Sequence, residues 1–284
     1  MITPYRGRLA PTPTGLLHVG HAATFYHAWR RAREVNGSLV LRIEDLDPHR
    51  CKTEFADSCQ EDLLWLGIDW DEGPFFQRDR REFFLRAWKH LRDQGLIYPC
   101  HRSRRDVETC PLAPHCEDRI FPATWRGNPK ISVRFASPEG VNWRFRVPDG
   151  EQLSFLDTRL GLMTKTAGTD FGDFLVWNRA DVPAYELAVV VDDAAMRITE
   201  VVRGEDLVMS TFRQLLLYRA LEIPPPSFCH TPLILDASGR RLSKRSDSLS
   251  LAACRHQGLQ PKDIFALINS NPEGVLPNGF PPFA

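Results

Sequence analysis

The chain has 284 residues, of which 43% are hydrophobic and 25% charged, and basic and acidic residues balance at 36 each. A chain of this length can bury a substantial core, so we expect one catalytic domain with an insertion. No apolar run approaches the roughly 20 residues of a bilayer span, and the N-terminus lacks the apolar region of a signal peptide. We therefore expect a cytoplasmic protein without membrane contacts, in which any contact with nucleic acid depends on local basic patches. The seven cysteines should be reduced thiols.

The N-terminal part predicts the opening of a doubly wound parallel sheet. A short strand precedes "APTPTG", the apolar spacing predicts a helix from Gly20 to Asn36, and "SLVLRIED" is the next strand. A strand, a helix and a second strand within about 40 residues are typical of the Rossmann-type α/β class. Ligands of such sheets bind at the carboxyl ends of the strands.

The middle of the chain has a different composition. Helices are predicted at residues 53–66 and 80–94, and residues 100–181 are rich in proline, basic residues and short alternating stretches such as "KISVRFA" and "NWRFRV". Alternation of apolar and polar residues is typical of half-buried strands. We therefore expect an inserted subdomain that contains β-strands.

The sheet is expected to resume after the insertion. "AYELAVVVDD" and "MRITEVVRGED" are interpreted as strands, "STFRQLLLYRALE" as a helix, and two short helices follow Lys244. The predicted domains are the first half of the catalytic domain (1–99), the insertion (100–181), the second half (182–245) and a short helical C-terminal segment (246–284).

Two histidines, His18 and His21, lie three residues apart in "HVGH" at the start of the first predicted helix. They share one helix face, where exposed backbone N–H groups and the helix dipole favour an anion. Imidazoles can donate hydrogen bonds to a phosphate that gains charge, and Gly20 lets a flat base approach the backbone. The alternative is that both histidines only cap the helix.

A second basic segment, "GRRLSKR", lies more than 200 residues downstream. Arg241, Ser243 and Lys244 in a glycine-led loop can hold phosphates, with the lysine as a mobile point charge and the serine as a neutral donor. The alternative is a solvated surface turn.

The two segments together resemble a known family. "APTPTGLLHVGH" resembles the first signature of class I aminoacyl-tRNA synthetases, and "RLSKR" resembles their second. "LRIEDLDPHR" and "VVVDDAAMRITEVVRGEDLVMSTFRQ" are similar to the glutamyl-tRNA synthetase branch. The resemblance extends to about residue 255 and implies the Rossmann-type catalytic domain of a class I synthetase.

This resemblance implies a glutamate pocket and an ATP site. Because glutamate carries two carboxylates and an ammonium group, a selective pocket requires guanidinium groups and an acid. By resemblance, Arg8 and Arg203 hold carboxylate, Glu44 holds the α-ammonium, and Thr12 and Tyr185 complete the pocket. The alternative for each is a surface or strand-edge ion pair. The implied ATP-binding residues are His18, Gly20, His21, Asp206, Arg241, Ser243 and Lys244, of which His18, His21 and Lys244 are the catalytic residues.

The implied reaction needs no covalent nucleophile on the protein. The glutamate carboxylate attacks the α-phosphorus of ATP, pyrophosphate leaves, and an acceptor hydroxyl then attacks the mixed anhydride. Mg²⁺ is expected to accompany the nucleotide rather than to occupy a site made only of protein ligands.

The chain differs from the glutamyl-tRNA synthetase branch in the expected acceptor of the activated glutamate. About 40 residues follow Arg245, too few for the helical anticodon-binding domain of a full glutamyl-tRNA synthetase. The chain, with "RGEDLVMSTFRQ", is more similar to a truncated paralogous group that attaches glutamate to queuosine in the anticodon of tRNA(Asp). We therefore expect L-glutamate, ATP and the queuosine-containing anticodon stem-loop as partners of a monomer. Arg102, Arg104 and Arg105 of the insertion are candidates for phosphate contacts, with a solvated charge run as the alternative.

Three other functions stay open on the sequence alone. The chain could charge tRNA 3′ ends as a glutamyl-tRNA synthetase catalytic fragment, or it could be an "HxGH" nucleotidylyltransferase. It could also be a non-catalytic paralogue that binds glutamate or tRNA. The presence of His18, His21, Ser243 and Lys244 favours an enzyme.

The resemblance also bears on zinc. Several members of the family bind zinc in the insertion through a Cys-x-Cys pair and a later Tyr and Cys. This chain has Cys100 but carries Arg102, Phe121 and Trp125 at the corresponding positions, so we expect no zinc there. An alternative tetrahedral set, which lacks the usual short cysteine spacing, consists of Cys110 and Cys116 with His101 or His115.

Overall fold

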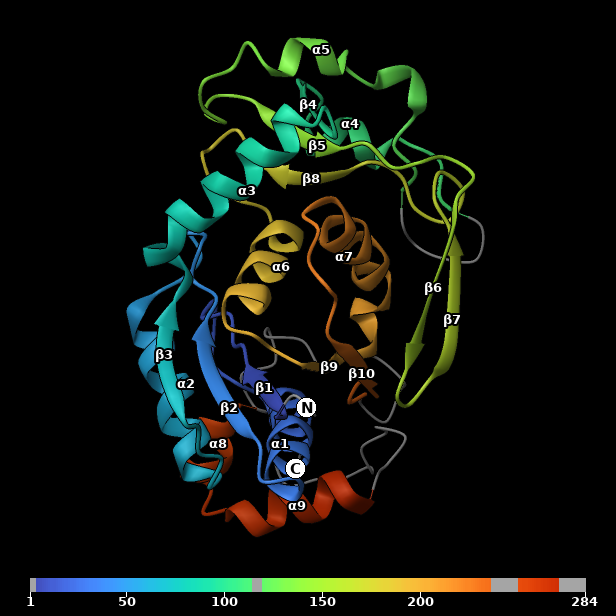
Figure 1. The fold of residues 1–284 in the computed structure, drawn as a ribbon. Helices are drawn as coiled ribbons and strands as arrows, with labels where there is room; N and C mark the ends of the chain where they lie inside the picture. The colour runs from blue at the N-terminus through green and yellow to red at the C-terminus, as the bar shows by residue number, and fades with distance from the viewer. Residues whose placement is uncertain (1–3, 114–118, 236–249, 271–284) are drawn as a thin grey trace. The chain divides into compact units, whose positions relative to one another are not determined.

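The computed structural model describes residues 4–113, 119–235 and 250–270, and Figure 1 shows its elements. The chain forms two compact units, and each is described by itself. The first unit comprises residues 1–79, 198–207 and 227–284, and the second comprises residues 80–197 and 208–226. The domain boundaries expected from the sequence remain predictions.

The first unit is built on parallel strands. Strand β1 pairs with β2, β2 pairs with β3, and β9 pairs with β10, all in parallel. A hydrogen bond of 2.8 Å from the Thr199 N–H to the Arg6 carbonyl oxygen places the start of β9 beside β1. The strand order therefore reverses between β1 and β9, which confirms the predicted doubly wound α/β class. The elements are β1 (Arg6–Leu9), α1 (Val19–Glu34), β2 (Ser38–Ile43), α2 (Thr53–Trp65), β3 (Glu72–Phe76), η1 (Gln77–Arg80), β9 (Glu200–Gly204), η3 (Glu205–Leu207), β10 (Ser227–Thr231), α8 (Leu251–His256) and α9 (Pro261–Ser270).

The core of the first unit lies around the central strand β2. All of β2 except its first residue is buried, which is usual for a parallel strand covered on both faces. Helix α1 buries mainly small side chains, among them Ala22, Ala28 and Ala32, so its backbone can approach the sheet closely. Tyr26 of α1 stacks on Phe265 of α9 with ring centroids 4.4 Å apart. The C-terminal helices thus belong to the same hydrophobic core.

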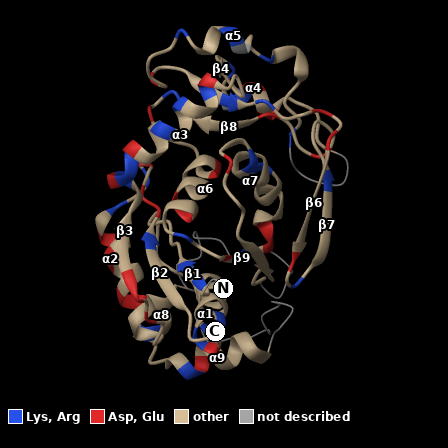
Figure 2. Cartoon of the chain, viewed as in Figure 1, with Lys and Arg blue, Asp and Glu red and all other residues tan. Residues whose placement is uncertain are grey.

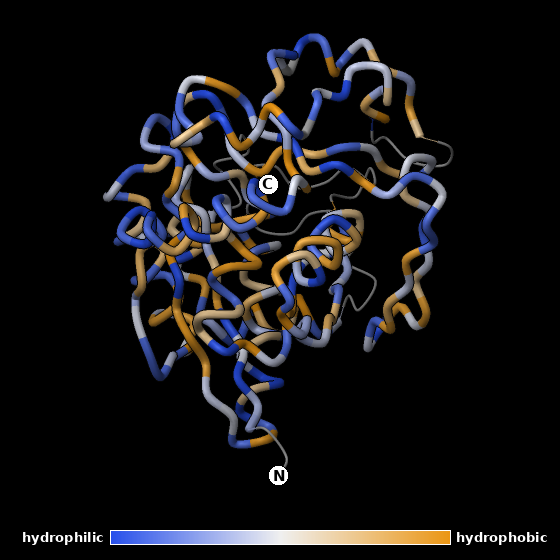
Figure 3. The backbone as a smooth tube through the Cα atoms, turned by 45° about the horizontal axis from the view of Figure 1, so that its top comes forward, coloured by the Kyte–Doolittle hydropathy of each residue, from blue (hydrophilic) through white to orange (hydrophobic). Residues whose placement is uncertain are grey.

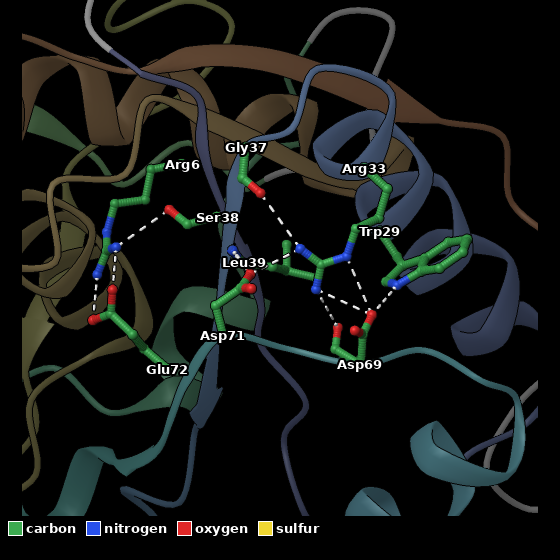
Figure 4. Close-up of polar contacts among 9 residues, drawn as sticks. All are labelled: Arg6, Trp29, Arg33, Gly37, Ser38, Leu39, Asp69, Asp71 and Glu72. Carbon is green, nitrogen blue, oxygen red and sulfur yellow. Dashed lines mark hydrogen bonds and ion pairs between the residues drawn. The ribbon is translucent and has the colours of Figure 1, made fainter.

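Ion pairs hold the amino ends of the strands together (Figure 4). Arg6, the first residue of β1, donates two hydrogen bonds, of 2.5 and 2.7 Å, to Glu72, the first residue of β3. Arg33 near the end of α1 donates to Asp69 at 3.0 Å and to Asp71 at 2.9 Å. These contacts are partly exposed and fix the edge of the sheet that lies opposite the expected ligand-binding edge.

The second unit contains an antiparallel sheet of order β4-β5-β8, a β6–β7 hairpin and helices. Its core includes Trp88 of α3, which packs edge-on against Trp143 of β5 with ring centroids 4.9 Å apart. Large aromatic side chains dominate the burial here. The elements are α3 (Arg81–Asp93), β4 (Ile97–Cys100), α4 (Arg104–Glu108), η2 (Ala123–Trp125), α5 (Pro129–Ser132), β5 (Asn142–Phe145), β6 (Gln152–Asp157), β7 (Gly161–Thr166), β8 (Phe174–Trp177), α6 (Tyr185–Ala195) and α7 (Val208–Ala220).

Hydrophobic and hydrophilic residues alternate in short runs along the trace (Figure 3). Within the part of the chain that the structure describes, no helix has the length and apolar character needed to cross a bilayer. The six cysteines described are free thiols, as expected.

Two stretches interpreted as β-structure are helical. "AYELAVVVDD" forms α6, because a continuous apolar run has no period that separates a strand from a helix buried on all sides. "KISVRFA" begins inside α5, which Asn128 caps by accepting a hydrogen bond of 2.9 Å from the Lys130 N–H. The helices expected near residues 53–66, 80–94 and 210–222 and the two short C-terminal helices are confirmed.

Glu200 at the start of β9 links three segments of the first unit. Its carboxylate is 5% exposed and accepts hydrogen bonds from the Tyr5 hydroxyl at 2.8 Å and from the Arg31 guanidinium at 2.5 and 2.6 Å. Burial and the negative charge of Glu200 hold the pKa of Tyr5 above its ordinary value. The carboxylate therefore ties β9 to α1 and to the residue before β1.

We expect the substitution Glu200→Gln to lower the free energy of unfolding by about 1–3 kcal/mol, because the charge that Arg31 faces is lost. Urea denaturation at neutral pH measures this change. The matched control is Glu34→Gln, which removes an exposed i,i+4 pair with Arg30 and should change the free energy of unfolding by less than about 0.5 kcal/mol. Equal losses in the two variants would contradict the prediction.

Candidate active site at the carboxyl ends of the parallel strands

Three of the predicted glutamate-binding residues lie at one edge of the sheet in the first unit. Arg8 is next to last in β1, Glu44 directly follows β2, and Arg203 is next to last in β9. The three side chains are buried, with exposed fractions of 5%, 8% and 3%. Since carboxyl ends of neighbouring parallel strands share one edge, the fold gathers two guanidinium groups and one carboxylate where this class of sheet binds ligands.

The two arginines are held by neighbouring strands. Arg8 Nη1 donates a hydrogen bond of 2.7 Å to the carbonyl oxygen of Val202 on β9. Arg203 Nε donates at 3.2 Å to Nε2 of His230, which is fully buried on β10. Because Nε2 of His230 accepts, the neutral ring carries its proton on Nδ1. These contacts hold both guanidinium groups in place with neutral acceptors, so neither positive charge is neutralised by these partners.

Glu44 has a neighbour that the sequence reasoning missed. Arg42 is entirely buried on β2, and its Nη2 donates a hydrogen bond of 3.0 Å to Oε1 of Glu44. The backbone N–H of Glu44 donates to the carbonyl oxygen of Pro11 in the first-signature turn at 2.9 Å. The sequence could have indicated this neighbour, because Arg42 and Glu44 are two residues apart and therefore lie on one face of a strand. No comparable signal pointed to His230.

The other predicted pocket residues are more exposed. Thr12 lies in the turn after β1 and Asp206 in η3, and both side chains are exposed. Tyr185 is 37% exposed and opens α6 in the second unit, not the end of a strand as expected, because its segment is helical. The roles of these three residues in binding glutamate and ribose remain predictions.

His18 and His21 lie at the start of α1, as predicted. Nδ1 of His18 accepts a hydrogen bond of 3.1 Å from the Gly20 N–H, and Nδ1 of His21 accepts one of 3.2 Å from the His18 N–H. Both histidines therefore cap the helix, and the rings lie 3.8 Å apart. An imidazole whose Nδ1 accepts carries its proton on Nε2, so capping leaves each neutral ring with an Nε2–H donor. Capping and phosphate binding are compatible.

Gly20 is required by His18 in this turn. A side chain at Gly20 would place its Cβ 3.0 Å from the His18 ring and 3.6 Å from Ile234. The expected approach of a flat base to this glycine remains a prediction.

The described residues on either side of segment 236–249 lie near the first signature. Ile234 precedes it and lies beside Gly20, and Ser250 follows it and forms an antiparallel β-bridge with His18. The chain thus leaves and returns at the start of α1. The predicted residues of the second signature, Arg241, Ser243 and Lys244, fall in this segment and lie outside the described residues.

Aromatic and arginine side chains occupy the positions that correspond to the zinc ligands of some family members. Phe121 packs edge-on against Trp125 with ring centroids 5.6 Å apart, and the Arg102 guanidinium lies 4.4 Å from the Trp125 ring. Cys100 belongs to the same small hydrophobic cluster. This set does not fit a zinc ion, because only one of its four side chains is a zinc ligand.

The alternative zinc set is described only in part. Cys110 is buried, which raises the pKa of its thiol, and His101 is exposed. Among the residues described, no three or more His, Cys, Asp or Glu side chains are grouped to hold an ion. Arg102 and Arg105 are exposed, and their contacts with phosphate remain predictions. Cys116 and His115 lie outside the described residues.

We expect the purified protein to contain no stoichiometric zinc, because the cluster around Trp125 is held by ring and guanidinium contacts. Metal analysis by mass spectrometry measures the content, and a chelator should leave the thermal midpoint unchanged within about 1 °C. One zinc per chain would contradict this prediction. The variant Cys110→Ser would then show whether the alternative set binds the ion.

Comparison with known proteins places most of the chain in one group. Residues 5–270 match the family described as tRNA synthetases class I (E and Q), catalytic domain. The Glutamyl-Q tRNA(Asp) synthetase of Nitratidesulfovibrio vulgaris is 40% identical over 97% of this chain and 88% of that protein. The protein of the same name from Symbiobacterium thermophilum is 42% identical over 91% of this chain and 83% of that protein. The Glutamate–tRNA ligase of Synechococcus sp. is 41% identical over 89% of this chain but only 55% of that protein.

Solved structures support the fold. A glutamate tRNA ligase from Elizabethkingia meningosepticum, in complex with its amino acid, is 24% identical with a TM-score of 0.77, over 94% of this chain and 60% of that one. Methionyl-tRNA synthetase of Mycobacterium tuberculosis, bound by methionyl-adenylate, is 14% identical with a TM-score of 0.57, over 94% of this chain and 64% of that one. The chain thus spans about three-fifths of the length of these proteins.

Proposed function

The chain belongs to the class I tRNA synthetases for glutamate and glutamine, and we propose that it activates L-glutamate with ATP and transfers it to queuosine in the anticodon of tRNA(Asp). The observation that carries the activation step is the buried set of Arg8, Glu44 and Arg203 at one edge of the sheet. The acceptor is proposed from the relatives named Glutamyl-Q tRNA(Asp) synthetase, of which the match covers more than four-fifths. A monomeric state is part of the proposal.

Glutamate is the amino acid that suits this set of charges. Arg8 and Arg203 would each hold a carboxylate, and the Glu44 carboxylate would hold the α-ammonium. Burial strengthens these interactions, because water competes less for the charged groups. Glutamine would leave one guanidinium without an anionic partner, which a buried site penalises.

The start of α1 is suited to the activation step. As the glutamate oxygen attacks the α-phosphorus and the bond to the pyrophosphate oxygen breaks, negative charge grows on the α-phosphate oxygens. The Nε2–H groups of His18 and His21 and the helix N-terminus would stabilise that charge. Lys244 would hold the departing phosphates, since Ile234 and Ser250, which lie on either side of its segment, are beside Gly20 and His18. Mg²⁺ bound with the nucleotide neutralises phosphate charge.

Transfer to the acceptor completes the reaction. A hydroxyl of the queuosine cyclopentenediol attacks the carbonyl carbon of the mixed anhydride, AMP leaves with the bonding electrons, and the hydroxyl proton is lost to solvent or phosphate. The product is an ester between glutamate and the base. Bases of a single-stranded loop can turn away from their neighbours, which makes an anticodon loop a feasible acceptor.

We expect two variants to separate binding from activation. Lys244→Ala should lower kcat of pyrophosphate exchange about 100-fold with little change in KM for glutamate, because its contact forms mainly in the transition state. Arg203→Ala should raise KM for glutamate roughly 30-fold or more, because a buried charge-assisted contact is lost. The exposed Arg30→Ala is the control and should change neither constant. The same kinetic defect in both active-site variants would refute this division of roles.

The proposed function predicts two results in sequence. Without tRNA, the protein should exchange pyrophosphate into ATP with glutamate and not with glutamine or aspartate, since Arg8, His18 and Arg203 belong to one compact unit. With labelled glutamate, a queuosine-containing anticodon stem-loop of tRNA(Asp) should accept an alkali-labile label, whereas the queuosine-free stem-loop should not. In full-length tRNA the label should survive removal of the 3′-terminal adenosine. Label lost with that adenosine would instead support charging of tRNA 3′ ends.

A further inference from the structure

One acidic residue of helix α2 is buried. Acidic side chains gather on α2 (Figure 2), and Glu54, Asp57 and Glu61 are exposed, whereas Asp62 has no exposed surface. Neither carboxylate oxygen of Asp62 accepts a hydrogen bond from the residues that the structure describes. A buried carboxylate without donors destabilises the fold, so its presence in the core points to a role other than stability.

The cation that faces this carboxylate comes from helix α8. Arg255 Nη2 lies 3.6 Å from Oδ1 of Asp62, and the Arg255 side chain is 38% exposed. At this distance the contact is an attraction between charges without a hydrogen bond. The pair therefore connects α2 to α8 only while Asp62 is ionised.

Helix α8 begins where the chain returns from segment 236–249. Ser250 caps α8 by accepting a hydrogen bond of 3.1 Å from the Ala253 N–H, and it bridges to His18. The Leu251 N–H donates at 2.8 Å to the carbonyl oxygen of Leu17. A displacement of α8 would therefore disturb the backbone at Leu17 and His18, where the first signature enters α1.

We propose that Asp62 is a positioning residue for glutamate activation: through Arg255 it holds α8, and with α8 the backbone contacts of Ser250 and Leu251 with the first signature at His18 and Leu17. This inference rests on the proposed function. Asp62 touches no substrate in this scheme. It acts by keeping the start of α1, which carries the two histidines, in place.

The ionisation of Asp62 supports this role. Burial raises the pKa of Asp62 to about 6, with the negative charge of Glu61 adding to the rise and Arg255 opposing it. The other titratable group that faces it from α8 is Cys254, a buried thiol whose pKa is itself raised. The Asp62 carboxylate that faces Arg255 is thus mostly ionised above about pH 6 and becomes protonated as the pH falls through that value.

The direction of the shift separates a positioning role from a structural one. A carboxyl group whose pKa is raised by folding stabilises the fold when protonated and costs stability as pH rises through its folded pKa. A neutral amide at position 62 should therefore not lower the unfolding midpoint at pH 7.5. The same substitution should nevertheless remove the electrostatic attraction between position 62 and Arg255.

The test compares Asp62→Asn with the wild type in tRNA-independent pyrophosphate exchange, with rates normalised to titrated active sites. At pH 7.5 we expect the exchange rate to fall about tenfold, with KM for ATP and glutamate changed less than about twofold. The unfolding midpoint should stay equal or rise. The ratio of wild-type to variant rate should approach one below pH 6, where the wild-type carboxyl is protonated. The matched control is Asp57→Asn, an exposed acid on the same helix, which should change none of these values.

Two further measurements trace the effect to α8. The Leu251 amide should exchange with deuterium faster in Asp62→Asn than in the wild type at pH 7.5. Arg255→Gln, which leaves the carboxylate without its cation, should lower both the rate and the midpoint, and adding Asp62→Asn should restore the midpoint but not the rate.

The outcomes separate the two proposals. No exchange by the wild type would overturn the proposed function and this inference with it. If the wild type exchanges pyrophosphate and Asp62→Asn does so at the same rate, the inference is overturned but the proposed function is not. The inference is also overturned if the exchange rate of Asp62→Asn falls and its unfolding midpoint falls with it. An unchanged Leu251 amide would overturn the route through α8.

Discussion

Guanidinium groups buried at the ends of parallel strands are the constraint on which the first unit depends. Arg8, Arg42 and Arg203 are removed from water, and each is held by a carbonyl, a carboxylate or an imidazole of its own or a neighbouring strand. The contacts of Arg8 and Arg203 exist only if β9 lies beside β1 and β10 beside β9. The sheet order and the candidate glutamate pocket are therefore specified by the same interactions. At the opposite edge the arginine pairs are partly exposed, and such pairs contribute little to stability.

Two buried acidic side chains of the first unit differ in how their negative charge is compensated. Glu200 is buried but accepts three hydrogen bonds, so its charge is compensated and it joins segments that are far apart in sequence. Asp62 is buried without such donors and faces one cation at a distance. Proteins commonly give up stability at positions that serve function, and the contrast between these two carboxylates is consistent with that rule.

Local patterns in the sequence predicted the first strand, α1 and β2, because a proline-rich turn and clear apolar periods mark them. The candidate residues Arg8, Glu44 and Arg203 came from resemblance, and the structure places them at one edge of the sheet. Helix α6 was wrongly interpreted because a continuous apolar run has no period. The burial of His230 and Asp62 depends on strands and helices distant in sequence, and no local pattern carries that information.

The first turn of α1 has a consequence for how phosphate recognition can be inherited or transplanted. The orientation of each histidine ring is set by a backbone N–H of the same turn, and the glycine between them is the residue that leaves room for one ring. The Nε2–H donors that the proposed function directs toward a nucleotide are thus produced by four consecutive residues and a helix start. Such an element can be transferred between folds as one piece, whereas the proposed pocket for the amino acid is assembled from separate strands and must evolve anew on each sheet.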